Sequence, residues 1–175
     1  MFKSSNIKYI IMFVLLVLLQ VLVLNRISFL GYGVPFAYVY FIIKLPIRSN
    51  KSVVIFLSFL IGFVIDIFCN TPGINAAAST FVGLVRWPVQ KLFFMVDDYD
   101  EQTPRLSLLG GAFIRYAIFL TLIHHIVLIS IESFSYFNLE ILLQRILLST
   151  LLTSLLVFAF EGLSFKKKNS WQKTS

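Results

Sequence analysis

Residues 53–92 have the sequence VVIFLSFLIGFVIDIFCNTPGINAAASTFVGLVRWPVQKL, which contains the clearest evidence for the architecture of the chain. It opens with the apolar segment Val53–Cys69, in which Asp66 is the only charged side chain. A helix of about 17–25 mostly apolar residues can span the hydrocarbon core of a bilayer. Pro72 and Gly73 then favour a tight turn, and a segment rich in small residues follows. The pattern predicts two membrane helices joined by a short connection.

Composition extends this prediction to the whole chain. Of the 175 residues, 58% are hydrophobic and 13% are charged, and the mean hydropathy is +0.89. Soluble domains contain about 25% charged residues, and a small soluble domain cannot bury so much apolar surface. These values exclude a soluble globular enzyme and a disordered chain, and a lone Cys69 excludes a disulfide-stapled secreted domain. Residues 1–175 are predicted to form one polytopic membrane domain.

Six apolar segments fit such a domain. The predicted spans are residues 7–24, 34–47, 53–69, 74–96, 106–131 and 141–160, followed by a basic cytoplasmic tail at 166–175. The second is short and contains Lys44, which is expected to snorkel to the membrane interface. The fourth is short or kinked, because Pro88 interrupts it. We therefore predict an all-α integral membrane protein built as a six-helix transmembrane bundle.

The basic residues predict the orientation of this bundle. If the amino terminus is cytoplasmic, twelve of the 15 Lys and Arg residues lie on the cytoplasmic side or at span ends facing it. Arg26 alone lies on the opposite side, and Arg115 and Arg145 lie within spans. This distribution follows the positive-inside rule and places both termini in the cytoplasm. The net charge of +7 is therefore assigned to topology and to contact of the tail with anionic lipids, not to nucleic acid.

The side chain of Asp66 has more possible roles than any other polar residue of the chain. A carboxylate within a span usually faces a partner or a cavity, and Asp66 shares a helix face with Asn70, four residues later. Three roles stay open: a cap or brace of the turn after Cys69, a proton or ion ligand, and an ion pair with Arg115 or Arg145. The depth predicted for Arg115 in its span makes an Asp66–Arg115 pair geometrically possible.

His124 and His125 are the only histidines in the chain. On a helix, adjacent side chains point about 100° apart, and no second cluster of His or Cys accompanies them, so no metal site or cofactor is predicted. They are expected to form hydrogen bonds at a helix interface. No nucleophile with a matching base is evident, which argues against an enzyme. An intramembrane enzyme using either histidine is the weakest alternative. Arg145 is expected to snorkel outward at the start of the last span.

The stretch around Asp66 resembles the central motif of the rod shape-determining MreD family. The motif has a span ending in aspartate, a Pro-Gly type turn, a small-residue helix and then a basic residue. Its residues here are Gly62, Asp66, Asn70, Pro72, Gly73, the run from Ala76 to Ser79, and Arg86. The sequence LIHH around His124 and the sequence LLSTLLTSLL at 147–156 are similar to members from Bacteroidetes-type bacteria. The resemblance covers nearly the whole chain.

The resemblance implies a non-enzymatic scaffold of the bacterial inner membrane that serves lateral peptidoglycan synthesis and cell shape. Its implied partner is MreC, through the transmembrane helix and membrane-proximal region, with indirect links to MreB, RodA and the class B penicillin-binding transpeptidase. The family's likeness to the S components of energy-coupling-factor transporters implies a six-helix bundle with a central cavity. We expect MreC to dock on a small-residue face formed by Ala77, Ser79 and Gly83. The alternative function is a substrate-binding component of a vitamin-type uptake transporter, with its ligand near Asp66 and Arg115.

Overall fold

The structure is a computed structural model that describes residues 4–27, 29, 31, 33–95, 103–134 and 138–172, with side chains between Ile7 and Leu163. The elements are α1 (Ser4–Leu22), the short 3₁₀ helix η1 (Leu24–Arg26), α2 (Val39–Lys44), α3 (Lys51–Cys69), α4 (Ile74–Phe93), α5 (Leu106–Leu109), α6 (Gly111–Glu132) and α7 (Leu139–Gln172). The only strand-like pairing among the described residues is an isolated bridge between Phe29 and Gly33. The predicted all-helical architecture is therefore confirmed for this part of the chain.

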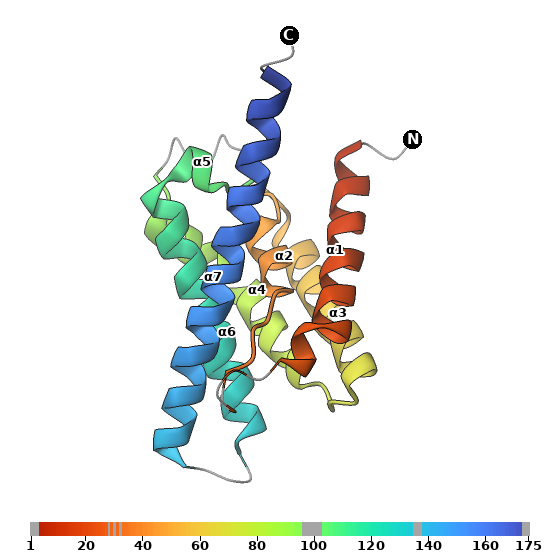
Figure 1. Ribbon diagram of the computed structural model, residues 1–175, viewed down its shortest axis with the longest axis vertical. Helices are drawn as coiled ribbons and strands as arrows, with labels where there is room; N and C mark the ends of the chain where they lie inside the picture. The colour runs from red at the N-terminus through yellow and green to blue at the C-terminus, as the bar shows by residue number, and fades with distance from the viewer. Residues whose placement is uncertain are drawn as a thin grey trace.

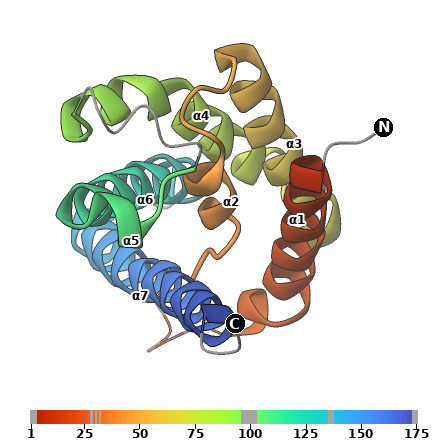
Figure 2. The same ribbon diagram turned by 90° about the horizontal axis from the view of Figure 1, so that it is seen from above.

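The longer helices form a ring around α2. Helix α3 packs on α4, α4 on α6 and α6 on α7, while α1 packs on α3. Helix α2 lies at the centre and contacts α1, α3, α4 and α6 (Figure 2). Helix α1 begins and α7 ends at the same end of the bundle, which we call the upper end after Figure 1. The turn from α3 into α4 lies at the opposite, lower end (Figure 1).

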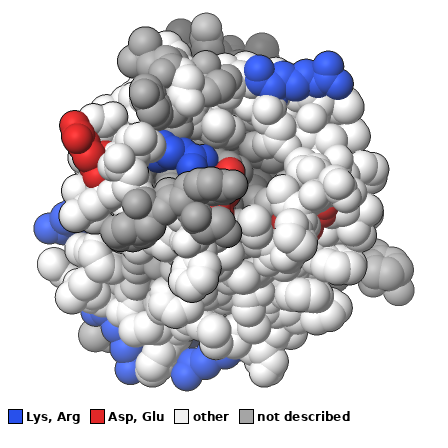
Figure 3. Space-filling view, turned by 90° about the horizontal axis from the view of Figure 1, so that it is seen from below, with Lys and Arg blue, Asp and Glu red and all other residues white. Residues whose placement is uncertain are grey.

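Four helical segments are long and apolar enough to cross a membrane: Ile7–Arg26, Lys51–Cys69, Gly111–Glu132 and Leu139–Leu163. Their outer faces carry large exposed apolar side chains, as expected for contact with lipid. The lower face of the bundle is mostly uncharged, with a few acidic and basic side chains beside a central hollow (Figure 3). The predicted count of six spans is not confirmed, because within the described part of the chain α4 is less apolar than these four segments and α2 has only six residues.

The predicted second span, 34–47, differs most from expectation. Only Val39–Lys44 is helical, and residues 33–38 approach α2 as non-helical chain. Pro35 has no backbone N–H to continue a helix. Residues from Ala37 to Ile43 are nevertheless buried, with at most 7% of their surface exposed. The centre of the bundle is thus occupied by a broken segment of its own chain, where an unbroken helix was predicted.

Two other predicted boundaries also change. The span at 106–131 is divided by Gly110, whose φ of +50° separates α5 from α6. Arg115 consequently lies in the second turn of α6, much nearer the upper end than predicted. Pro88 lies inside α4, and the helix continues beyond it. Helix α7 extends past the predicted end at residue 160, while the side chains of the basic tail lie outside the described residues.

The interface of α3 and α4 depends on residues without large side chains. A Cβ atom built on Gly62 would lie 2.7 Å from Cα of Ala76 and would collide with the side chain of Ser79. A Cβ on Gly83 would lie 2.9 Å from Cβ of Ser58. The face predicted to receive MreC is therefore largely covered by α3. Of its three residues, Ser79 and Gly83 are buried there and only Ala77 is exposed.

Replacing Gly62 by alanine tests this close packing. The added methyl group must push α3 and α4 apart, and such overpacking typically costs 1–3 kcal/mol. We expect the free energy of unfolding in detergent to fall by about 2 kcal/mol. Gly162→Ala in α7 is the control, because no atom lies within 4 Å of the new Cβ there. A Gly62→Ala protein as stable as Gly162→Ala would contradict the packing.

Candidate functional site

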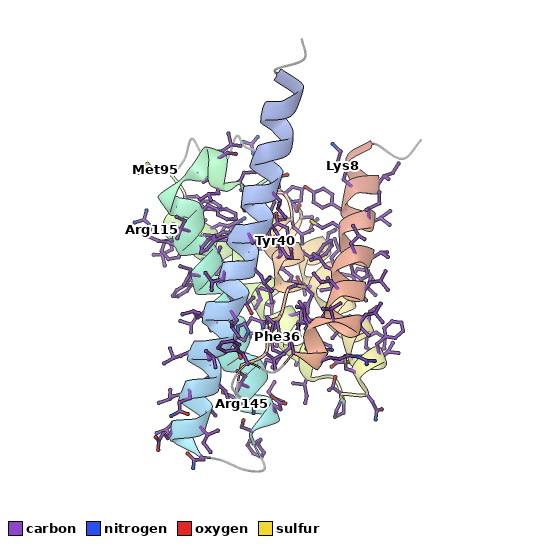
Figure 4. All side chains as sticks on the ribbon, viewed as in Figure 1. Lys8, Phe36, Tyr40, Met95, Arg115 and Arg145 are labelled. Carbon is purple, nitrogen blue, oxygen red and sulfur yellow. The ribbon has the colours of Figure 1, made fainter. Side chains whose placement is uncertain are left out.

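Buried polar side chains surround the segment 33–47, and we call this set the polar core. Its members each expose 9% of their surface or less: Gln20, Lys44, Asp66, Asn75, Arg86, His124, His125, Ser149, Thr153 and Glu161. They come from α1, α2, α3, α4, α6 and α7, so every long helix contributes at least one. Phe36 and Tyr40 of the segment point into the bundle, whereas Lys8, Met95 and Arg115 lie on its periphery (Figure 4).

The non-helical stretch takes its hydrogen bonds from α1 and α7. The bonds run from Val34 N to Ser149 Oγ (3.1 Å), from Phe36 N to Thr153 Oγ1 (2.9 Å), from Ala37 N to Gln20 Oε1 (2.8 Å) and from Gln20 Nε2 to the Pro35 carbonyl (3.1 Å). Within a membrane, non-helical backbone is tolerated only where protein or water satisfies its polar groups. Side chains of the two neighbouring helices supply the bonds that a continuous helix would make within itself.

Arg86 satisfies the carbonyl groups at the end of α2. Its Nε donates to the carbonyl of Ile42 at 3.0 Å, and its Nη2 donates to the carbonyl of Leu45. The guanidinium also approaches the carbonyl of Pro46, at 3.4 Å from Nη2. The last carbonyls of a helix have no partner within it, and the planar fork of donors on Arg suits several acceptors at once. The motif residue Arg86 therefore terminates α2 from within the bundle.

Lys44 and Glu161 form a buried ion pair with 2.6 Å between Nζ and Oε1. Lys44 also donates to the carbonyl of Pro104 at 2.7 Å. Glu161 accepts from the hydroxyl of Tyr40 at 2.7 Å and from the backbone N–H of Leu106 at 3.0 Å. The prediction that Lys44 snorkels to the interface is wrong, because a carboxylate inside the bundle holds the ammonium group. Sequence reasoning missed Glu161, although it is the only charged residue between 146 and 163.

Asp66 caps the start of α4. Its carboxylate accepts from the backbone N–H of Asn75 at 3.0 Å and that of Ala76 at 2.8 Å, and from the side chains of Asn75 and Thr71. Among the three roles left open by the sequence, this geometry is that of the cap and brace. The first N–H groups of a helix lack partners within it, and a carboxylate suits them. Asn70 ends α3 in the left-handed conformation, with φ of 53°, and its side chain is exposed.

The two arginines within predicted spans lie away from Asp66. Arg115 is exposed on the outer side of α6 near the upper end (Figure 4), whereas Asp66 lies in the last turns of α3 at the lower end. The geometrically possible Asp66–Arg115 pair is thus not formed, because the break at Gly110 moves Arg115 away. Arg145 pairs with Glu132 at 2.6 Å, and this half-exposed contact joins the end of α6 to the start of α7.

His124 belongs to a directed chain of hydrogen bonds. The hydroxyl of Tyr38 lies 2.9 Å from Asn75 Oδ1 and 2.8 Å from His124 Nε2. Because the amide nitrogen of Asn75 donates to Asp66, its oxygen must accept from Tyr38. His124 Nε2–H must then donate to Tyr38. Each donor in the chain, from His124 through Tyr38 to Asn75, therefore points toward the carboxylate of Asp66. Hydrogen bonds aligned in one direction polarise and strengthen one another.

His125 orients the side chain that holds the non-helical stretch. Its Nδ1 lies 2.7 Å from the carbonyl of Thr121 and must therefore donate, which leaves Nε2 as an acceptor. Thr153 Oγ1, 3.3 Å from Nε2, donates to it and at the same time accepts from the N–H of Phe36. Both histidines thus help to position residues 36–38. Among the described residues, no group of three or more His, Cys, Asp or Glu could hold a metal ion.

No family model matches the chain, and neither a curated protein nor a solved structure matches it. Its function is therefore inferred from the residues and geometry described above.

Substitution of Asp66 tests the cap. Asp66→Asn keeps one acceptor and should lower the free energy of unfolding by about 1–2 kcal/mol, whereas Asp66→Ala should lower it by about 3 kcal/mol. The measurement is chemical unfolding in detergent. Glu132→Gln removes an exposed carboxylate and should change stability by less than about 1 kcal/mol. Equal losses for Asp66→Ala and Glu132→Gln would refute the capping role.

The buried ion pair can be tested with a double-mutant cycle. Glu161→Gln leaves the ammonium of Lys44 buried without a counter-charge, a change that typically costs about 3–5 kcal/mol. The double variant Lys44→Met with Glu161→Gln should lose less than the sum of the single losses. The same cycle on half-exposed Arg145 and exposed Glu132 should show a coupling below about 1 kcal/mol. Additive losses at Lys44 and Glu161 would contradict the pairing.

Proposed function

We propose that this protein is a non-enzymatic membrane scaffold of the bacterial cell-elongation machinery, similar to the MreD family, and that it binds MreC. The observation that carries this proposal is the buried segment 33–47. A binding component for a small molecule needs a cavity that encloses its ligand. Here Tyr38, Phe41 and Ile42 occupy the centre of the ring, and each exposes at most 1% of its surface.

The hydrogen bonds made by the polar core also support the proposal of a scaffold. Asp66, His125 and Arg86 bond to backbone groups of the protein itself, and Lys44 bonds to Glu161. These bonds hold the fold together and leave partner contacts to the outside of the bundle. The outer faces are lined by large apolar side chains, including Leu15, Phe56, Ile67, Leu147 and Leu151. Helices associate in lipid through close packing of such faces and of small residues between them.

The proposed orientation places the upper end in the cytoplasm. Helix α1 begins there and α7 ends there (Figure 1), in keeping with the proposal that both termini share one side. The basic residues Lys8, Lys51, Lys91 and Arg105 also belong to segments at this end. By the positive-inside rule this end faces the cytoplasm of a bacterial inner membrane. Links to MreB, RodA and the class B transpeptidase would then run through MreC.

The docking face proposed for MreC is the outer side of α4 around Ala77. The other residues of the predicted face, Ser79 and Gly83, are covered by α3. Ala77 is exposed next to Phe81 and Leu84, which expose 43% and 54% of their surface. A small residue among larger ones lets a second helix approach closely.

A pull-down from native membranes in mild detergent tests the function. Mass spectrometry of proteins and small molecules in the eluate should find MreC and wall synthases. Ala77→Leu places a bulky side chain on the docking face and should lower the recovered MreC at least tenfold. Ala159→Leu, at an exposed alanine of α7, is the matched control and should leave recovery unchanged.

Two results would count against this function. Unchanged MreC recovery with Ala77→Leu would refute docking on α4. A vitamin-like molecule recovered together with ATPase subunits would overturn the scaffold and support the transporter alternative.

A further inference from the structure

The chain between α4 and α6 ends in a short segment that bonds to three other helices. We call residues 103–109, which have the sequence TPRLSLL, the strap. It contains the four-residue helix α5 and lies at the upper end of the bundle (Figure 1). Only Pro104 and Leu109 of the strap are buried. A segment with so few buried side chains is of the kind that opens locally while the rest of a protein stays folded.

Three hydrogen bonds hold the strap against α1, α2 and α7. They join the hydroxyl groups of Tyr9 and Thr103 (2.9 Å), Lys44 Nζ and the carbonyl of Pro104 (2.7 Å), and the N–H of Leu106 and Glu161 Oε2 (3.0 Å). Helix α5 itself packs mainly on α6, the helix that follows it. The attachment of the strap to the other three helices therefore depends largely on these bonds.

Gly110 joins the strap to α6 and has the properties of a hinge. Its φ of +50° and ψ of −124° form a conformation that suits glycine alone. Gly111, the first residue of α6, follows directly, and no atom lies within 4 Å of a Cβ built on either glycine. Neighbouring side chains therefore do not restrain rotation here. Leu109, one of the two buried residues of the strap, is next to the hinge and moves least when the strap turns.

The strap also completes the surroundings of the buried ion pair. Pro104 bonds to Lys44 and Leu106 bonds to Glu161, and the two charged side chains expose 11% and 2% of their surface. The loss of hydration of two buried charges can offset most of their attraction. Opening of the strap breaks its three bonds but returns water to both charges. The free-energy cost of opening is therefore expected to be much lower than that of unfolding the bundle.

We propose that the strap rotates about Gly110 and so opens and closes the upper end of the bundle at the Lys44–Glu161 pair. In the closed state, which the structure shows, the strap shields the pair and ties α1, α2 and α7 together. In the open state both charges meet water, while α6 and the rest of the ring stay folded. The strap thus connects movement of the chain between α4 and α6 to the central segment. This inference does not depend on the proposed scaffold function.

Hydrogen exchange of backbone amides, resolved residue by residue in detergent, tests this motion. The amide of Leu106 is the reporter, because its hydrogen-bond partner belongs to α7. When reclosing is fast, the exchange rate follows the population of the open state. Leu106 should exchange about 100-fold faster, or more, than amides in the buried middle of α6, which exchange only when the bundle unfolds.

Two substitutions at the attachments of the strap should increase its opening. Tyr9→Phe removes the bond to Thr103 and should raise the exchange rate of Leu106 about fivefold. Gly110→Ala adds a side chain where the closed strap needs a glycine conformation, and should raise this rate about tenfold. Gly111→Ala is the matched control for the second variant. The φ of Gly111 is not positive, so its substitution should leave the rate unchanged.

Gly62→Ala separates opening of the strap from unfolding of the bundle. This substitution forces apart α3 and α4, to which the three bonds of the strap do not run. It should accelerate exchange in the middle of α6 about 30-fold, because the whole bundle becomes less stable. The exchange rate of Leu106 should stay unchanged, because the open and closed states of the strap share the α3–α4 contact.

Three results would overturn the proposal. Equal acceleration of Leu106 and the middle of α6 by Gly62→Ala would mean that the strap opens only when the bundle unfolds. An unchanged Leu106 rate in Tyr9→Phe would mean that α1 does not hold the strap closed. Equal effects of Gly110→Ala and Gly111→Ala would show that Gly110 is not the hinge.

Discussion

Backbone that leaves the helical conformation inside a membrane needs protein or enclosed water to satisfy its polar groups, and here side chains of the neighbouring helices do so. This requirement explains most of the polar residues in the bundle. The N–H groups of Phe36 and Ala37 bond to side chains of α7 and α1, and Arg86 donates to the carbonyls of Ile42 and Leu45. Each neighbouring helix must therefore stay at a fixed height relative to α2. The same bonds that satisfy the segment set the register of the ring around it.

Two buried charges are stabilised in different ways. Asp66 has the N–H groups at the start of α4 and needs no cation, because the partial positive charge of a helix start balances it. Lys44 ends a helix of only six residues and is balanced by a full negative charge on Glu161. The first arrangement joins α3 to its neighbour α4, and the second joins the central α2 to α7. The first closes the lower end of the bundle, and the second closes the upper end.

The sequence predicts those features that depend on nearby residues. The helix at 53–69 and the turn after Asp66 follow from an apolar run and a Pro-Gly pair. Pro35 is a local sign of the break at 34–38, but the bonds that stabilise the break could not be predicted, because Val34 bonds to Ser149, 115 positions away. Lys44 was misplaced for the same reason, since Glu161 lies 117 positions further on. The local sequence pattern does not reveal partners so far along the chain. A single acidic residue in an apolar segment, such as Glu161, is nevertheless a feature that sequence analysis can look for.

The partners of the central segment have a consequence for how the protein is made. Ser149, Thr153 and Glu161 all belong to α7, which is synthesised after all the other described helices. Residues 34–44 are synthesised more than a hundred residues earlier, with their polar groups still unsatisfied. Unpaired backbone groups and an unpaired ammonium are costly in lipid. The hydrogen bonds and the ion pair of this segment can therefore form only after α7 has been synthesised, so the docking of α7 is the step that satisfies the centre of the bundle.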